Sequence, residues 1–272
     1  MLKDMTLGQY FPGNSILHKI DPRMKLILAV LYIVMIFLAK TPLAYVFVLA
    51  SAVGLIFLSR LHMRVILRGL RPILFIIFLT ACINIFWTRG ETPLVDWKFI
   101  HIYPEGIQFA IFMMVRIVSL VIGTAVILTY TTSPIALTDG LEHLLMPLSK
   151  LHLPVHEFSM MMTIALRFIP TLVEETDKIM SAQKSRGTDF SSGSLLRRAK
   201  ALIPVMVPLF ISAINRATEL AVAMECRCYR GGTGRTKMNR LQYRPRDFLA
   251  LLCVCCMCAV VLLLNRYTPM IV

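Results

Sequence analysis

The chain has 272 residues, of which 57% are hydrophobic and 16% are charged, and its formal net charge is +14. A soluble globular domain is about 45–50% apolar and about 25% charged, so this composition excludes an ordinary water-soluble protein and indicates that lipid solvates most of the chain. The positive charge favours an anionic neighbour such as a membrane leaflet, a nucleic acid or an acidic protein.

Five segments are predicted to span a membrane, because a spanning helix needs roughly 17–25 predominantly apolar residues. In chain order they are 24–39, 42–59, 72–87, 106–130 and 247–265. The first and third are short, and we expect them to recruit flanking residues.

Two features inside these spans need a physical explanation. Arg116 lies in the middle of the fourth span, where an unpaired charge is costly, so we expect it to pair with a carbonyl or with a polar side chain such as Asn84. The run CVCCMC at 253–258 lies inside the last span. A helix spreads these sulfurs around its circumference, so packing explains them better than a metal site.

The distribution of Lys and Arg predicts the orientation, because short cytoplasmic loops carry the excess of these residues. Basic residues gather before the first span, between the second and third spans, and within 131–246, whereas the 40–41 and 88–105 loops carry little net charge. The sequence therefore predicts a multi-pass protein with a cytoplasmic N-terminus and an external C-terminus. Its predicted parts are an N-terminal arm with four spans (1–130), a cytoplasmic helical domain (131–246) and a final span (247–272).

Two long helices are predicted in the cytoplasmic part. Residues 156–185 place apolar side chains three and four positions apart, as a helix with one apolar face does, and Gly187 is predicted to end this helix. A second helix is expected from Ser194 to about Glu225. Its apolar middle of fourteen residues, ALIPVMVPLFISAI, suits an interfacial or buried helix better than a span.

Together with a shorter helix around 134–150, these segments define the predicted fold class. It is an all-α membrane protein with about five transmembrane helices and a cytoplasmic coupling domain of long amphipathic helices. Two prolines in the second long helix, Pro204 and Pro208, should bend it.

Each long helix ends in an arginine between small residues, Ser-Arg-Gly at 185–187 and Cys-Arg-Cys at 226–228. Small neighbours let another surface approach the backbone, and the guanidinium offers a planar fork of donors to carboxylates or carbonyls. Docking into pockets of a partner protein is one interpretation. Anchoring to anionic lipid, worth about 1 kcal/mol per basic residue, is the other, and it explains the basic runs at 197–200 and 235–246 well.

Three longer stretches closely resemble the EcfT family, the transmembrane coupling (T) components of energy-coupling factor (ECF) type ABC transporters. HKIDPRMK (18–25) resembles the family's motif before its first span. Residues 165–190 and 202–232 resemble its two coupling helices, and the resemblance covers essentially the whole chain. The family's second arginine motif is commonly Ala-Arg-Gly, so the cysteine at 228 puts a positive φ at that position in question.

The resemblance implies a non-catalytic subunit of a vitamin transporter in the cell membrane. It would transmit the ATP-driven motion of two cytoplasmic ABC ATPases (EcfA- and EcfA'-like) to a membrane substrate-binding S component. The implied ATPase-docking residues are Ser185, Arg186, Gly187, Cys226, Arg227 and Cys228. The expected S-component interface comprises Met161, Met162, Ala165, Phe168, Ile169, Pro204 and Pro208. The chain itself would need no cofactor, because the ATPases bind ATP, and neither a metal nor a nucleic acid is expected as a ligand.

Other functions are weighed against this one. No HExxH motif, nucleophile elbow or dense cluster of intramembrane carboxylates supports a membrane enzyme. The spans carry too few polar residues to favour a permease with its own pore. The T component of a related cobalt or nickel importer stays open as the alternative.

Overall fold

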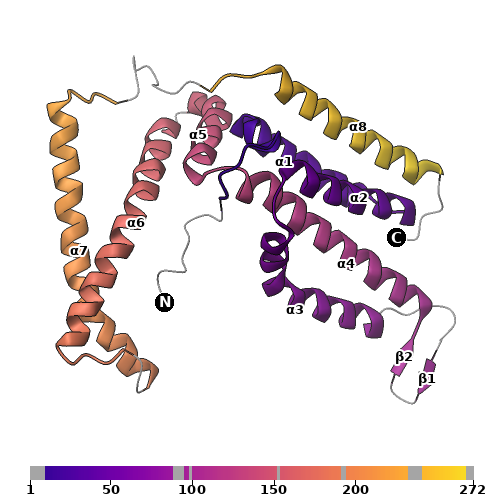
Figure 1. Ribbon diagram of the computed structural model, residues 1–272, viewed down its shortest axis with the longest axis horizontal. Coiled ribbons are helices and arrows are strands. Elements are labelled where there is room, and N and C mark those ends of the chain that lie inside the picture. The colour runs from indigo at the N-terminus through magenta and orange to yellow at the C-terminus, as the bar shows by residue number, and fades with distance from the viewer. Residues whose placement is uncertain are drawn as a thin grey trace. The chain divides into compact units, whose positions relative to one another are not determined.

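The computed structural model describes residues 10–87, 95–97, 100–151, 154–190, 194–231 and 241–267. The helices are α1 (Pro22–Leu38), α2 (Pro42–Ser59), α3 (Met63–Trp87), α4 (Pro104–Thr124), α5 (Pro134–Leu145), α6 (Val155–Ser185), α7 (Leu195–Cys226) and α8 (Pro245–Tyr267) (Figure 1). A π-helical segment, Ala125–Tyr130, continues α4, and 3-10 turns occur at Leu17–Lys19 and Met146–Leu151. Strands β1 (Val95–Trp97) and β2 (Ile100–Ile102) pair antiparallel between α3 and α4.

The chain forms two compact units. In the described residues, one unit comprises 10–141 and 241–267 and is called here the membrane unit; the other comprises 142–231 and is called the α6–α7 unit. The sequence placed these borders at 130/131 and 246/247. The first turns of α5 belong to the membrane unit, where Gly140 lies against Pro22 and the backbone of Arg23 so closely that a Cβ would crowd them.

Five helical stretches within the described residues are long and apolar enough to cross a membrane: Pro42–Ser59, Met63–Trp87, Pro104–Tyr130, Leu196–Cys226 and Pro245–Tyr267. Four of them coincide with predicted spans, and the third span does recruit flanking residues at its start. The first predicted span forms α1, whose 17 residues lie at the lower limit for a crossing. These helices confirm a multi-pass membrane protein.

Helix α1 is the buried centre of the membrane unit. Its Tyr32, Met35 and Ile36 are at most 1% exposed, and they pack with residues of α2, the π-helical segment and α8, such as Val48 and Val261. A Cβ on Gly123 of α4 would overlap the ring of Tyr32, so this glycine lets α4 approach α1 closely. Because residues of α2, of the π-helical continuation of α4 and of α8 share one core cluster with α1, the shortest of these four helices is also the most buried.

Polar contacts at the two ends of the membrane unit fix the directions of its helices. At one end, the Lys25 ammonium of α1 donates to the carbonyl of Thr131 just after α4 at 2.8 Å, and the backbone N–H of Asp21 donates to Asp247 of α8 at 3.0 Å. At the other end, the side chain of Asn265 in α8 accepts from the backbone N–H of Lys40 at 3.1 Å. Helices α1 and α8 therefore run in the same direction and α4 in the opposite one. If these three helices cross a bilayer, the chain between α4 and α8 begins and ends on the same side.

Arg116 of α4 is paired as a mid-span charge must be. Its guanidinium donates to the carbonyl of Ala39 at 3.3 Å and to the hydroxyl of Tyr45, and it lies over the Tyr45 ring, 5.5 Å from the centroid. The expected carbonyl partner is confirmed, whereas the suggested partner Asn84 is wrong. The Asn84 amide instead donates to the Thr80 carbonyl one turn earlier in α3, at 2.8 Å, which satisfies it within its own helix.

Helices α6 and α7 lie side by side and run antiparallel. The hydroxyl of Tyr229, just after α7, lies 3.2 Å from the sulfur of Met160 near the start of α6, while Glu175 in the middle of α6 accepts from Arg216 of α7 at 2.7 Å. Figure 1 shows the two helices crossing, with α7 changing direction in its first half, as its prolines predict. Among their described side chains only Ser159 and Val205 are buried, so most of both helices is free to contact other molecules.

Candidate docking site

The end of α6 has a specific backbone geometry. The N–H of Gly187 donates to the carbonyl of Lys184 at 3.0 Å, and the N–H of Thr188 donates to that of Gln183 at 3.0 Å. This pair of bonds is the Schellman pattern, in which the residue after the helix cap is left-handed. Gly187 accordingly has φ +86°, and the prediction that it ends the helix is confirmed.

The end of α7 repeats this geometry. The N–H of Cys228 donates to the carbonyl of Glu225 at 2.8 Å, and the N–H of Tyr229 donates to that of Met224 at 3.1 Å. Cys228 has φ +55°, so the turn is the same although glycine is replaced. A left-handed conformation costs a non-glycine residue roughly 1–2 kcal/mol, which the capped turn must offset.

The two arginines occupy equivalent positions in these turns. Arg186 has φ −84° and ψ 6°, and Arg227 has φ −91° and ψ 13°; each is the cap residue of its helix. Both are exposed, as are their neighbours Ser185, Gly187, Cys226 and Cys228. Neither guanidinium has a hydrogen-bond partner within the described part of the chain, so both are available to a second molecule. We call Arg186 and Arg227 the two tips.

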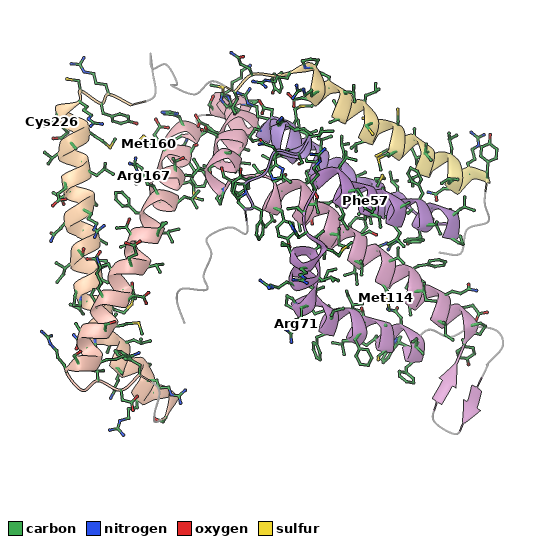
Figure 2. The ribbon with its side chains drawn as sticks, viewed as in Figure 1. Phe57, Arg71, Met114, Met160, Arg167 and Cys226 are labelled. Carbon is green, nitrogen blue, oxygen red and sulfur yellow. The ribbon has the colours of Figure 1, made fainter. Side chains whose placement is uncertain are left out.

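The two tips lie at opposite ends of the helix pair. Arg227 borders a hollow with Met160 and Ile164 from the start of α6, and Figure 2 shows Cys226 at the end of α7 close to Met160. Arg186 follows the last turn of the same α6. From position 160 to position 186 a helix rises about 39 Å at 1.5 Å per residue, so one partner pocket of ordinary size cannot hold both tips.

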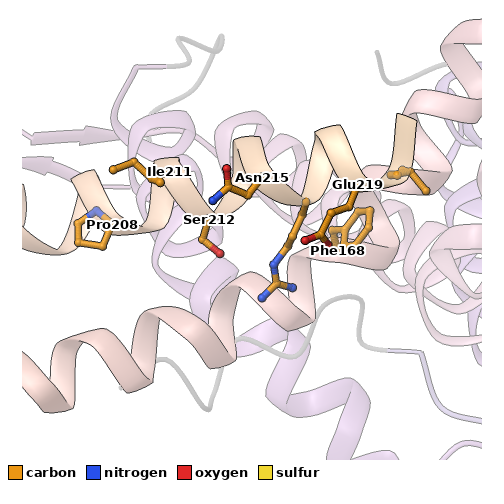
Figure 3. Close-up of a pocket in the computed structure, with 8 residues that line it drawn as sticks. Phe168, Pro208, Ile211, Ser212, Asn215 and Glu219 are labelled. Atoms are coloured by element: carbon orange, nitrogen blue, oxygen red, sulfur yellow. The ribbon is translucent and has the colours of Figure 1, made fainter. Parts of the chain in front are cut away.

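The residues expected at the S-component interface fall into different environments. Met161, Met162 and Ala165 are exposed on the first half of α6, and Phe168 and Ile169 are half-buried; Pro204 and Pro208 are exposed on α7. Phe168 and Pro208 line one groove between the helices, together with Ser212, Asn215 and Arg216 (Figure 3). Because the helices are antiparallel, Met161 lies toward the Arg227 end and Pro204 toward the Arg186 end, so the set does not form one patch.

The second helix adds a larger apolar surface than the two prolines suggested. Seven large apolar side chains between positions 202 and 214 of this helix are exposed: Leu202, Ile203, Met206, Val207, Phe210, Ile211 and Ile214. The apolar run 201–214 indicated this surface. A polar contact of Glu175 with Ser212 and Arg216 was missed, because only the antiparallel register of α6 and α7 brings these positions together.

Both kinds of comparison with known proteins match this chain to transport proteins. The family model described as cobalt transport protein matches residues 13–238. The energy-coupling factor transporter transmembrane protein EcfT of Clostridium kluyveri is 53% identical over 254 residues, which cover 93% of this chain and 94% of that protein. Proteins of the same name are 53% identical over 249 residues in Ruminiclostridium cellulolyticum, covering 92% of each chain, and 46% identical over 247 residues in Bacillus subtilis, covering 91% of this chain and 93% of that protein. The similarity thus spans both units.

Proposed function

This chain belongs to the EcfT family of energy-coupling factor transporter transmembrane proteins, and we propose that it is the coupling subunit of a vitamin transporter in the cell membrane. It joins two cytoplasmic ABC ATPases to a membrane S component that binds the vitamin. It carries the ATP-driven motion of the ATPases to the S component, and it is not itself catalytic. ATP is bound by the ATPases, so the chain needs no cofactor of its own.

The observation that carries the proposal is the pair of equivalent, exposed arginine tips. Two helix ends with the same backbone turn suit two similar grooves, one on each ATPase. Each exposed guanidinium can donate to acidic groups or carbonyls of such a groove. The small residues beside each arginine let the groove wall approach the helix end, so Ser185, Gly187, Cys226 and Cys228 serve as close-packing neighbours.

The proposal requires both tips to be cytoplasmic. Since the end of α4 and the start of α8 lie at one end of the membrane unit, the intervening chain crosses the bilayer twice or not at all. Two crossings would put Arg186 and Arg227 on opposite sides, because the tips lie at opposite ends of the pair. We therefore propose that α6 and α7 do not cross the bilayer and that both are cytoplasmic, on the same side as the N-terminus.

The exposed apolar side chains of α6 and α7 fit the other half of the coupling function. Contiguous exposed apolar surface marks a site of contact with protein or membrane. In this proposal, the S component contacts two separate surfaces: Met161, Met162 and Ala165 on α6, and the apolar residues around Pro204 and Pro208 on α7. Methionine side chains repack readily, which suits a surface that accepts more than one S component.

Co-purification from cells that express the whole transporter tests the proposal. Both arginines are changed to alanine, and the exposed Arg167 in the middle of α6 is changed to alanine as a matched control. The double variant should lose both ATPases and vitamin uptake, while the control keeps them. If the double variant still holds both ATPases and transports normally, the tips do not dock.

A cobalt or nickel importer is the second candidate, favoured by the description of the matching family as cobalt transport protein. The membrane subunits that co-purify with the chain separate the two functions. A vitamin-binding S component and uptake of labelled vitamin support the first proposal. Uptake of labelled cobalt or nickel with no vitamin uptake would support the second.

A further inference from the structure

Glu175 connects α6 to two successive turns of α7. Its carboxylate accepts a hydrogen bond from the Ser212 hydroxyl at 2.5 Å and another from the Arg216 guanidinium at 2.7 Å. Ser212 and Arg216 are four residues apart and so lie on the same face of α7. The side chains of Arg216 and Glu175 are 33% and 22% exposed, so water screens this ion pair only in part.

The position of this contact relative to the tips is symmetric. Arg186 follows Glu175 by eleven residues on α6, and Arg227 follows Arg216 by eleven residues on α7. At 1.5 Å per residue, each tip is about 16 Å from the contact along its own helix. Because the helices are antiparallel, the two equal segments extend in opposite directions from one crossing point.

The two segments are also built to be stiff. Residues 176–185 and 217–226 contain no glycine and no proline, whereas Pro170, Pro204 and Pro208 all precede the contact on their helices. Proline removes a backbone hydrogen bond and kinks a helix, so the bends that the sequence permits fall outside the two segments. Each tip therefore ends an unbroken helical arm.

Apolar packing alone would hold the crossing point poorly. Most side chains of both helices are exposed or half-buried, so few interdigitated apolar contacts fix the position of one helix along the other. A slide by one residue moves α7 about 1.5 Å, which takes Ser212 or Arg216 out of hydrogen-bonding distance of Glu175. The polar contact thus specifies the register that packing leaves open.

We propose that Glu175, Ser212 and Arg216 form a clasp that fixes where α6 and α7 cross and links two arms of equal length, so that displacement of one tip displaces the other. The three are positioning residues: they act through the tips and do not touch the ATPases. The inference rests on the proposed docking of the tips, but its structural half, a fixed crossing point, stands without that docking.

Charge reversal tests the clasp in the complete transporter. The variants are Glu175→Arg, Arg216→Glu and the double swap, with the milder Glu175→Gln and Ser212→Ala in case a reversed charge prevents folding. The exposed neighbour Glu174 provides the matched control, Glu174→Arg. Three quantities are measured: ATPase co-purification, vitamin uptake per ATP hydrolysed, and the distance distribution between spin labels at positions 182 and 223, each four residues before a tip, with the native cysteines replaced.

The single reversals should keep both ATPases, because the tips are intact. Uptake per ATP should fall about two- to fivefold, because the interaction free energy of a partly exposed ion pair corresponds to a factor of about this size. The distance distribution should broaden in both singles and narrow again in the double swap, while Glu174→Arg matches the parent. Unchanged distances and unchanged uptake per ATP in both singles would overturn the clasp. Docking is tested separately by changing Arg186 and Arg227, which should release the ATPases. Failure of the clasp is therefore distinguishable from failure of docking.

Discussion

The carboxylate of Asp247 at the start of α8 accepts a hydrogen bond from the backbone N–H of Asp21, just before α1, at 3.0 Å. Asp247 is 1% exposed, and its second oxygen accepts from the backbone N–H of Arg244 at 2.7 Å. Residues 226 positions apart are thereby joined where α1 and α8 both begin. The contact ties the start of α8 to the start of α1.

Replacing Asp247 should destabilise the membrane unit. Asp247→Ala leaves two backbone donors without an acceptor, and a buried donor without a partner costs about 1–3 kcal/mol. Asp247→Asn keeps one acceptor oxygen and should lose less. Thermal unfolding of the detergent-purified protein measures the order, with Arg246→Ala at an exposed neighbouring position as control. An Asp247→Ala protein as stable as the control would show that this contact adds nothing.

Cysteine labelling should place the α6–α7 loop and the C-terminal end of α8 on opposite sides of the membrane. In a background without native cysteines, Ser194→Cys should react with an impermeant maleimide only from the cytoplasm, and Tyr267→Cys only from outside. Both positions are exposed in their own units. Labelling of Ser194→Cys from outside would mean that α6 and α7 each cross the bilayer once, and Arg186 could then not reach a cytoplasmic ATPase.

Changing the cysteines around Arg227 to glycine should have opposite effects at 226 and 228. Cys228 has φ +55°, a conformation that glycine adopts freely, so Cys228→Gly should stabilise the end of α7 by about 1 kcal/mol. Cys226 is the last helical residue, where glycine costs about 0.5–1 kcal/mol relative to alanine. Hydrogen exchange of the last turn of α7 measures both changes.

Gly187→Ala provides the matching test on α6. Gly187 has φ +86° with open space around it, so an added methyl group is penalised by backbone strain alone. Faster exchange in the last turn of α6 is expected.

Slower exchange in Cys226→Gly than in Cys228→Gly would contradict the shared turn geometry at the two helix ends.

Features that depend on one helix could be predicted from the sequence, whereas contacts between separate helices could not. The ends of α6 and α7 could be predicted because Gly187 and the apolar spacing act within one helix, and the Arg116–carbonyl pair because any mid-span charge must find a partner. The choice of Ala39 and Tyr45 over Asn84, and the meeting of Glu175 with Arg216, depend on how separate helices pack. Cys228 departs from glycine preference because hydrogen bonds to Met224 and Glu225 hold the turn, a compensation that composition does not reveal.

Single changes at the tips should separate docking from lipid anchoring. If each arginine fills a desolvated groove, Arg186→Ala or Arg227→Ala leaves acceptors of the ATPase unpaired at a cost of about 2–5 kcal/mol. Each single variant should keep a weakened complex held by the other tip. The double variant should lose far more than twice as much ATPase affinity, because in the parent chain the first contact holds the second at a high effective concentration. Arg→Lys should restore binding only in part, since lysine lacks the planar fork.

Lipid anchoring predicts a different pattern for the same variants. In that case lysine replaces arginine without loss, because only charge matters, and removing Arg197 or Arg198 from the neighbouring basic run weakens binding as much as removing a tip, at about 1 kcal/mol per residue. Pull-down of each ATPase by the variants, at low and at high salt, distinguishes the two. The docked-tip model would be rejected if Arg227→Lys pulls down as much ATPase as the parent chain does and if changing Arg197 lowers that amount. A groove that recognises guanidinium geometry must bind arginine and lysine differently.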